Sequence, residues 1–328
     1  MHVVVIGAGS VGQSYGYFLQ RGGARVTYQV KPSHVESLRD GVVLYPWNRP
    51  AKQRPVPVQW KDYELVTSVE EALALQADVY CVATSATAMF GSAWFDQLCA
   101  GLGDATLVSL QPGTSVPEYV FARAPRDQVV WGLISLVAWP APLPGQDLPE
   151  PGQGFWVPWG SKLGFSGPDA RVAPLVQVMN AGGGPSTARE DIHADQAFAG
   201  PILANVVIPF ELSGWSMRAL SADRALLQLA ISCMRESWAW AERKTGKRTP
   251  LFQRTLGPGM LGFALRHILP LAPLDFEAFF RVHYTKIADQ TPVLLAQRIA
   301  DIQAAGLPTR NLEELQRRLL EKRETVGV

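Results

Sequence analysis

The sequence predicts an α/β protein, with an N-terminal Rossmann-type parallel-sheet domain over residues 1–188 and a mostly α-helical C-terminal domain over residues 189–328. Three observations lead to this prediction. Short β-branched runs alternate with helical patterns over about the first 140 residues, a glycine-rich turn follows the first run, and helical patterns dominate after about residue 189. A chain of 328 residues, 47% of them apolar, is large and apolar enough for two cores.

Five apolar runs have the length of strands, at residues 2–6, 24–30, 78–84, 105–110 and 129–137. Each of the first four precedes a helical pattern, at residues 11–20, 32–40, 88–100 and 116–123. Unbroken apolar strands between helices predict a parallel sheet that is covered on both faces. Residues 41–67 are expected to form a small antiparallel insert.

Pro- and Gly-rich segments divide the rest of the chain. Residues 140–168 begin as a surface loop, and a strand at about 154–167 is expected to close the sheet. A helix at 170–180 should end at the glycines 182–184, and the apolar stretch 197–215 is expected to form a buried helix pair. Further helices are expected at 221–244, 276–304 and 311–323, the last with Asn311 as its N-cap.

The composition gives little support to several other classes of protein. The net charge is +1 and no long basic run occurs, so a nucleic-acid partner is not expected. The three cysteines, Cys81, Cys99 and Cys233, are widely spaced, so we expect neither a disulfide framework nor a metal site. The apolar run at the N-terminus is too short for a signal-peptide core, and we expect a cytoplasmic protein without a membrane partner.

Residues Gly7-Ala8-Gly9-Ser10-Val11-Gly12 form the pattern G-x-G-x-x-G between a strand and an amphipathic helix. In this motif the first glycine permits the tight turn, the second lets the backbone approach a pyrophosphate, and the third lets helix and strand pack closely. The free N–H groups of the helix N-terminus can then bind phosphate. We therefore expect cofactor binding at Gly7, Gly9, Ser10, Val11 and Gly12, the alternative being a merely structural glycine turn.

The end of the second expected strand indicates which dinucleotide binds. An NAD site usually has Asp or Glu there to hold the ribose hydroxyls, whereas this chain reads Gln29-Val30-Lys31-Pro32-Ser33-His34. Lys31 can meet a 2′-phosphate, with help from Gln29, Ser33 and His34. The sequence therefore favours NADPH over NADH, unless Lys31 is a plain surface charge.

Several segments together resemble the ketopantoate reductase family, the 2-dehydropantoate 2-reductases, over nearly the whole chain. The resemblance rests on GAGSVG, the basic residue that closes the second strand, LRDGV, the strand that leads into Ala86, the Gln111–Gly113 segment and the helix around Asn205. It continues through HYTKIADQTP and GLPTRNLEEL near the C-terminus. The resemblance implies hydride transfer from NADPH to a 2-oxo acid, with a lysine that assists protonation of the forming alkoxide.

The chain departs from the family pattern at four polar positions. The catalytic lysine of the family lies four residues before an asparagine that matches Asn205, and this chain has Pro201 there. A second lysine of the family matches Ser85, its loop asparagine matches the Gln111-Pro112-Gly113 segment, and its substrate-binding glutamate falls near residues 290–292. These changes together make ketopantoate itself an unexpected substrate, and they leave the cofactor motif intact.

Other residues are candidates for the missing acid. Lys286 is the first candidate, since a lysine partly desolvated beside a cofactor can have a lowered pKa and donate a proton. Tyr284 and His283 are alternatives, and each of the three can also be read as a surface or structural residue. Glu211, in an apolar stretch, could bind a substrate amine or cap a helix, and Asn205 could orient the substrate or form a core hydrogen bond.

The residues together predict an NADPH-dependent oxidoreductase that reduces a carbonyl, a 2-oxo acid or a larger ketone, between its two domains. Thr84, Ser85 and Gln111 are expected to line the nicotinamide side at the carboxyl ends of strands. Aromatic residues, among them six of the ten tryptophans, are expected near this region, although tryptophans are more often core residues. The alternatives are a non-catalytic NADP(H)-binding protein and an imine- or opine-type reductase. A small-molecule substrate is the expected partner, and a homodimer is considered.

Overall fold

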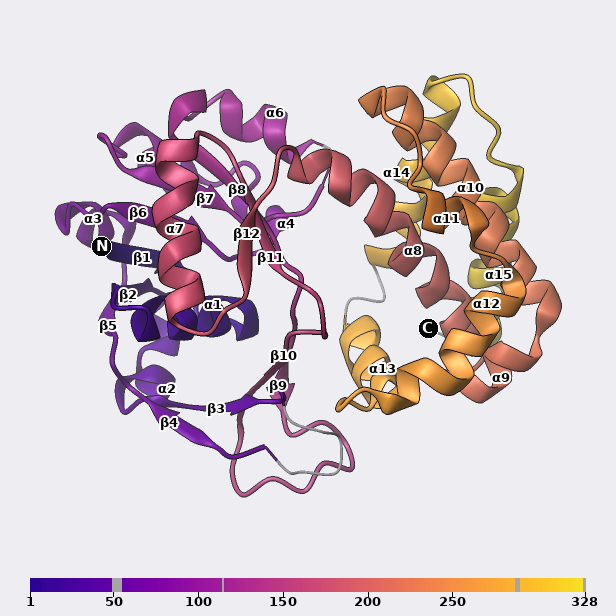
Figure 1. Cartoon of the computed structure of the whole chain (residues 1–328), viewed down its shortest axis with the longest axis horizontal. Helices are drawn as coiled ribbons and strands as arrows, with labels where there is room; N and C mark the ends of the chain where they lie inside the picture. The colour runs from indigo at the N-terminus through magenta and orange to yellow at the C-terminus, as the bar shows by residue number, and fades with distance from the viewer. Residues whose placement is uncertain (49–54, 114, 287–289, 327–328) are drawn as a thin grey trace. The chain divides into compact units, whose positions relative to one another are not determined.

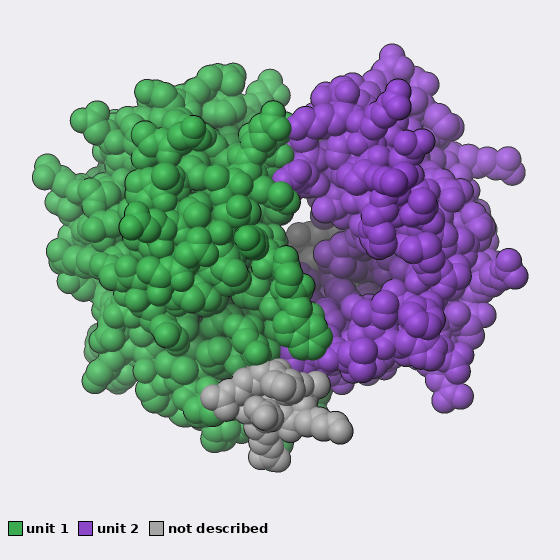
Figure 2. Space-filling model, in the orientation of Figure 1, with its two compact units in different colours: residues 1–49, 53–192 green, residues 50–52, 193–328 purple. Residues whose placement is uncertain are grey.

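The computed structural model describes residues 1–48, 55–113, 115–286 and 290–326. The chain divides into two compact units, with the division between Ile192 and His193 (Figure 2). The first unit is α/β and the second is helical, which confirms the predicted fold class. In the described part of the chain, no helix is long and apolar enough to cross a membrane.

The main sheet of unit 1 has eight strands in the order β12-β11-β8-β7-β6-β1-β2-β5. Every neighbouring pair is parallel except β8 with β11. The strands are β1 (His2–Ile6), β2 (Arg25–Gln29), β5 (Glu64–Val66), β6 (Val79–Val82), β7 (Thr106–Ser109), β8 (Val129–Leu133), β11 (Leu163–Ser166) and β12 (Ser186–Ala188). The order reverses direction beside β1, where open α/β sheets bind their ligands.

Helices cover both faces of this sheet, as the unbroken apolar strands predict (Figure 1). Side chains of β1 alternate between two cores: Val3 and Val5 enter one, and Val4 and Ile6 enter the other. The first core includes residues of α1 (Ser10–Arg21) and α7 (Asp169–Ala181). The second includes residues of α3 (Val69–Ala74), α5 (Ala93–Ala100) and α6 (Val116–Phe121).

A second, four-stranded sheet in unit 1 has the order β4-β3-β10-β9. It is built from β3 (Val42–Pro46), β4 (Val58–Trp60), β9 (Val137–Ala141) and β10 (Gly152–Trp156). The predicted insert at 41–67 is therefore only partly right, because β5 leaves it and pairs in parallel with β2 in the main sheet. The local sequence pattern does not show which strands pair when the paired segments are so distant in the chain.

Four other predicted elements of unit 1 are split. The strand expected at 154–167 is two strands, β10 and β11, separated by a turn at Gly160, whose φ of +75° favours glycine. The run 129–137 ends as a strand at Leu133, and β9 begins at Val137. The helix expected at 88–100 is α4 (Ala86–Met89) and α5, and the one expected at 32–40 is a 3₁₀ turn (Pro32–His34) and α2 (Glu36–Arg39).

Unit 2 consists of helices only among its described residues. They are α8 (Ile192–Leu212), α9 (Met217–Ala222), α10 (Arg224–Thr245), α11 (Leu251–Thr255), α12 (Pro258–Phe263), the π-helix η3 (Ala264–Ile268), the 3₁₀ turn η4 (Leu269–Leu271), α13 (Phe276–Lys286), α14 (Gln290–Ala304) and α15 (Arg310–Val326). Residues 287–289, within the helix expected at 276–304, lie outside the described part.

The expected helix pair at 197–215 is wrong, because one helix, α8, continues through Pro201 and Pro209. Each proline removes one backbone N–H, so the carbonyl four residues earlier loses its helical donor. Polar side chains one turn after each proline add hydrogen bonds to the proline carbonyls. The Nδ2 of Asn205 donates to the Pro201 carbonyl at 2.9 Å, and the Oγ of Ser213 donates to the Pro209 carbonyl at 2.9 Å. A single helix, α8, thus contains both prolines.

The predicted N-cap at Asn311 is also wrong, because α15 begins one residue earlier, at Arg310. The cap comes instead from the buried Glu236 of α10. Its carboxylate accepts hydrogen bonds from the backbone N–H groups of Asn311 and Leu312, at 2.9 and 3.0 Å. A carboxylate at a helix N-terminus satisfies free donors and interacts favourably with the helix dipole.

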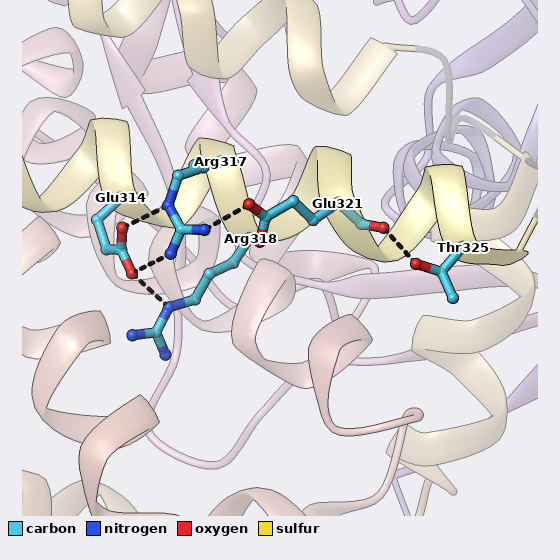
Figure 3. A network of polar contacts seen from close by, with 5 residues as sticks. All are labelled: Glu314, Arg317, Arg318, Glu321 and Thr325. Carbon is cyan, nitrogen blue, oxygen red and sulfur yellow. Dashed lines mark hydrogen bonds and ion pairs between the residues drawn. The ribbon is translucent and has the colours of Figure 1, made fainter.

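Helix α15 has one apolar and one charged face, as its helical spacing predicts. Leu312, Leu315 and Leu319 are fully buried. On the exposed face Glu314 pairs with Arg317 and Arg318, and Arg317 also pairs with Glu321 (Figure 3). The hydrogen bonds from Arg317 and Arg318 lower the pKa of Glu314 to about 2. These pairs are spaced i, i+3 and i, i+4, and such exposed pairs add only modest stability.

Candidate dinucleotide-binding site

The turn between β1 and α1 has the geometry that the glycine motif predicts. Gly7 has a φ of +100°, which favours glycine, and its N–H donates to the Gln29 carbonyl at 3.0 Å. A Cβ atom at Gly12 would lie 2.1 Å from the Gly7 carbonyl oxygen, so only glycine fits there. A Cβ at Gly9, the N-cap of α1, would have nothing within 4 Å. The backbone at Gly9 is therefore open to an approaching ligand.

A pocket of about 1070 Å³ lies in front of this turn, entirely within unit 1. It is lined by residues that follow four adjacent strands of the main sheet, β6, β1, β2 and β5. These include Gly7 to Gly9 after β1, Val30 and Lys31 after β2, Thr67 to Glu70 after β5, and Ala83 to Ser85 after β6. The carboxyl ends of parallel strands form the usual ligand site of such sheets.

Two buried polar atoms of residues that line the pocket have no hydrogen-bond partner within the described residues. They are Oε1 of Gln13 and Oγ1 of Thr84. A buried polar atom without a partner is costly unless a ligand or water completes it. Together with the open backbone at Gly9 and the N-terminus of α1, they fit a ligand with phosphate and hydroxyl groups, such as a nicotinamide dinucleotide.

The pocket wall at the end of β2 carries a cation and no carboxylate. Lys31 is exposed, lines the pocket and forms no ion pair with any residue that the structure describes. His34 and Ser37 line the same wall. Gln29, the last residue of β2, also lines the pocket. This arrangement leaves Lys31 available for an anionic group of a ligand.

The other expected cofactor residues have different positions. Thr84 and Ser85 line the pocket, and Ser85 is also the N-cap of α4, accepting a hydrogen bond from the Ala88 N–H. Gln111 does not line it: this buried side chain donates to the Val82 and Thr84 carbonyls at 2.8 and 2.9 Å. Gln111 therefore holds the end of β6 that carries Thr84.

Ser10 and Val11 do not line the pocket either. The Oγ of Ser10 donates to Oε1 of Gln153, a pocket residue of β10. Val11 is partly buried and packs against the core that includes Val3 and Val5. Both residues support the turn with their side chains, while their backbone belongs to the first turn of α1.

The sequence did not reveal one side of the pocket, formed by residues 67–70, Trp94, Gln97 and Gln153. Residues 67–70 follow β5, which the sequence placed in the antiparallel insert. Gln153 lies in a segment predicted as a surface loop. The capping signal Ser68-x-x-Glu71, in which the Ser68 hydroxyl accepts from the Glu71 N–H, could have indicated a strand-to-helix junction there.

Asn205 and Glu211, two of the predicted catalytic residues, are bonded within unit 2. Asn205 is 1% exposed, and its Nδ2 donates to the Pro201 carbonyl and to the Ser237 hydroxyl. The carboxylate of Glu211 forms a bidentate ion pair with Arg323 of α15, at 2.8 and 2.9 Å. These contacts favour a structural role for both residues over a role in binding the substrate.

The remaining catalytic candidates lie on α13. The ring of Tyr284 stacks on Trp215, with centroids 6.4 Å apart, and burial raises the pKa of Tyr284 to about 12. His283 is exposed and stacks on Phe279. Lys286 is the last residue of α13, and its side chain lies outside the described part of the chain.

The six tryptophans expected near the substrate lie in varied surroundings. Trp139, Trp156 and Trp238 are buried, and the indole N–H of Trp238 donates to the Phe198 carbonyl. Trp159 is 69% exposed, and Lys244 lies over the ring of Trp240. Within unit 1 the tryptophan that lines the dinucleotide pocket is instead Trp94.

Metal binding finds no support in the described residues, among which no group of three or more His, Cys, Asp or Glu side chains could hold an ion. The three cysteines are free and buried. Burial raises the pKa of Cys81 and Cys99 to about 12 each, and burial also raises the pKa of Cys233. Thiolates, the form that binds metals, are thus disfavoured.

Comparison with known proteins gives one family match. Residues 3–139 match the family model described as ketopantoate reductase PanE/ApbA. No curated protein matches the chain by sequence. The matched residues include the glycine turn, the residues after β2, β5 and β6, and Gln111.

Solved structures similar to this chain include three that cover nearly all of it. D-mandelate dehydrogenase, in a ternary structure with NADH and anilino(oxo)acetate, has a TM-score of 0.72 and 14% identity, with 100% of both chains covered. A PanE/ApbA family ketopantoate reductase from Ralstonia eutropha JMP134 has a TM-score of 0.70 and 18% identity, again with 100% of both chains covered. The 2-dehydropantoate 2-reductase from Methylococcus capsulatus has a TM-score of 0.69 and 18% identity, covering 98% of this chain and 97% of its own. These likenesses show a shared fold.

Proposed function

We propose that the chain is a member of the ketopantoate reductase family, which the match over residues 3–139 supports, and that it is an NADPH-dependent reductase of a carbonyl compound. The substrate that we propose is a 2-oxo acid or a larger ketone. Membership in a family of NAD(P)-dependent oxidoreductases supports the reaction class. The choice of NADPH and of the substrate is our proposal.

One observation carries this proposal: a glycine turn, open at Gly9 and closed at Gly12, lies beside a large pocket at the carboxyl ends of four strands. In the proposed complex, the N–H groups of the first turn of α1 bind the diphosphate. Thr84 and Gln13 offer the hydrogen-bonding atoms Oγ1 and Oε1, which otherwise have no partner within the described residues. Gln111 acts through its bonds to the Thr84 carbonyl, as a positioning residue.

Lys31 supports the choice of NADPH. It stands at the end of β2, where NAD sites usually hold the ribose hydroxyls with a carboxylate, and Gln29 precedes it. An ammonium group there favours a 2′-phosphate by charge and hydrogen bonding. The D-mandelate dehydrogenase structure contains NADH, so the fold alone does not decide between the two cofactors.

The chemistry divides between cofactor and protein. When bound, the cofactor would supply the hydride that reduces the carbonyl carbon. The protein must orient the carbonyl and give a proton to its oxygen. We propose Lys286 for the proton, because Pro201 stands where the family has its lysine and has no proton to give. Tyr284, with its pKa raised to about 12, would stay protonated at neutral pH and is the second candidate.

The proposed substrate is larger than ketopantoate or differs from it in polarity. The four changed family positions, with Pro201 inside α8, motivate this proposal. The anilino(oxo)acetate bound by D-mandelate dehydrogenase shows that a protein of this fold can bind an oxo acid with an aromatic group. We therefore rank aryl-substituted 2-oxo acids first among substrates to test.

The second candidate function is the binding of NADP(H) without turnover. The presence of Pro201 where the family has its lysine favours this candidate. An imine- or opine-type reductase would depend on Glu211 to bind an amine. That carboxylate is engaged with Arg323, which counts against this alternative.

The test is the oxidation of NADPH by purified protein, followed at 340 nm, with a panel of 2-oxo acids, ketones and imines. The account predicts turnover with at least one carbonyl compound and a smaller rate in Lys286→Ala. Tight NADPH binding without oxidation of any panel member would favour the non-catalytic protein. Turnover that requires an amine and disappears in Glu211→Gln would restore the opine-type alternative.

A further inference from the structure

Unit 2 contains a pocket of about 740 Å³ that the proposed dinucleotide site does not use. It is lined by residues of α9, η3, η4, the segment 272–275 and the start of α13, all of which belong to unit 2 (Figure 2). The volume lies within the range of small-molecule sites. The pocket is formed by unit 2 alone and shares no residue with the proposed dinucleotide site.

The inner wall of this pocket is apolar. Met217, Leu265 and Leu274 line it and are 7%, 3% and 4% exposed. Phe276, the first residue of α13, adds a buried ring. A ligand that enters the pocket would therefore bury hydrocarbon against these side chains, which is favourable because apolar surface leaves water.

Two arginines line the same pocket. Arg218 and Arg266 are both exposed, and neither side chain forms a hydrogen bond or ion pair with another residue in the described part of the chain. A guanidinium group binds a carboxylate through two parallel hydrogen bonds, a geometry that few other side chains match. The pair thus provides unengaged positive charge next to an apolar wall.

The two carboxylates that line the pocket are already engaged by backbone donors. Glu277 Oε1 accepts from the Met217 N–H at 2.7 Å, which ties α13 to α9. Asp275 Oδ1 accepts from the Ala278 N–H at 3.0 Å, in the first turn of α13. Each carboxylate thus has one oxygen held by a backbone donor of unit 2, whereas neither guanidinium is held by a described residue. We therefore assign the polar contact with a ligand to the guanidiniums, which favour an anion.

The local backbone supports the assignment. Leu265 and Arg266 belong to a π-helix, a rare wide turn that occurs often at functional sites. In this turn Leu265 is buried and the adjacent Arg266 is exposed, yet both line the pocket. The π-helix therefore presents one apolar and one charged side chain to the same space.

We propose that this pocket binds a small organic carboxylate with an apolar body. The carboxylate lies against Arg218 and Arg266, and the hydrocarbon lies against Met217, Leu265 and Leu274. The binding step is a simple association and needs no other reactant.

Isothermal titration calorimetry of the full chain with octanoate tests this proposal. We expect octanoate to bind, and to bind about tenfold more weakly to Arg218→Gln and to Arg266→Gln, because each loses a charge-assisted hydrogen bond. Arg224→Gln, an exposed arginine at the start of α10 that does not line the pocket, is the matched control and should bind as the unmodified protein does. Octylamine, the same chain with a cation, should bind more weakly than octanoate.

Three results would overturn the proposal: no binding of octanoate, equal affinity in all four proteins, or octylamine binding as tightly as octanoate. Since both arginines are exposed, the substitutions should leave the unfolding temperature nearly unchanged, and thermal melts verify that each variant is folded. A separate NADPH titration of the same samples keeps the result apart from the proposed function. NADPH binding without octanoate binding would refute only the carboxylate pocket.

Discussion

The Gly7 carbonyl oxygen lies 2.1 Å from the place where a Cβ atom would be at Gly12, whereas a Cβ at Gly9 would meet nothing within 4 Å. The two glycines are therefore required for different reasons. Gly12 is required by the fold of the turn, because a side chain would collide with backbone. Gly9 is free of such a collision within the chain, so a side chain there would collide only with a ligand that comes close to the turn.

The first prediction uses this difference. Gly12→Ala should lower the free energy of unfolding by about 1–3 kcal/mol, because the turn must move to make room for the methyl group. Gly9→Ala should leave stability nearly unchanged and still weaken NADPH binding at least tenfold, since the methyl group occupies the place of the diphosphate. Denaturant unfolding and calorimetric NADPH titration measure the two effects. Unchanged NADPH affinity in Gly9→Ala would refute the placement of the diphosphate.

The second prediction concerns cofactor choice. Lys31→Ala should weaken NADPH binding by about tenfold or more, with little change for NADH, because only NADPH has the 2′-phosphate. Lys162→Ala, which removes an exposed lysine of unit 1 outside the pocket, is the control. The test is to measure the dissociation constants of NADPH and NADH for each protein at one fixed salt concentration. Equal losses of affinity for the two cofactors would show that Lys31 does not bind the 2′-phosphate.

The third prediction concerns the pair Glu211–Arg323, whose side chains are 14% and 11% exposed. Removing one partner leaves the other charge nearly buried, so Glu211→Gln or Arg323→Met should cost about 3 kcal/mol of unfolding free energy. The double variant should lose less than the sum of the two single losses. Denaturant unfolding of the four proteins gives this coupling. Additive losses would mean that the ion pair contributes no net coupling.

The fourth prediction concerns pH. Burial raises the pKa of Tyr284 from 10.0 to about 12, so the folded protein favours the neutral phenol. This contribution to stability is complete below about pH 10 and is lost as the pH rises toward 12. Between these values the unmodified protein should lose about 2 kcal/mol more stability than Tyr284→Phe, which lacks the ionisable group. Parallel losses in both proteins would show that Tyr284 does not titrate this way.

The sequence was sufficient for the elements whose signals are local. β1 and α1 were predicted because an apolar run, a glycine turn and an amphipathic pattern adjoin one another in the chain. The position of Lys31 after β2 could be predicted because the next apolar run follows α1 directly in the chain. Long helices such as α10 and α15 were recognised from their 3.6-residue period, within a few residues at their ends.

What could not be predicted depends on contacts between distant residues. The pairing of β5 with β2 in the main sheet, and of β3 with β10, brings segments together that no local pattern connects. For this reason residues 67–70 and Gln153 were missed as pocket residues. The bonds of Asn205 to Ser237 and of Glu211 to Arg323 also join separate helices, and they show why an isolated polar residue in an apolar run need not contact a substrate.

The most direct test of the central claim is calorimetric titration of the purified protein with NADPH, with Gly9→Ala measured in parallel. The account predicts saturable binding at one site per chain, tighter for NADPH than for NADH, and strongly weakened in Gly9→Ala. The absence of binding for either nucleotide would contradict the assignment of the β1–α1 turn as a dinucleotide site, and with it the proposed enzymatic function.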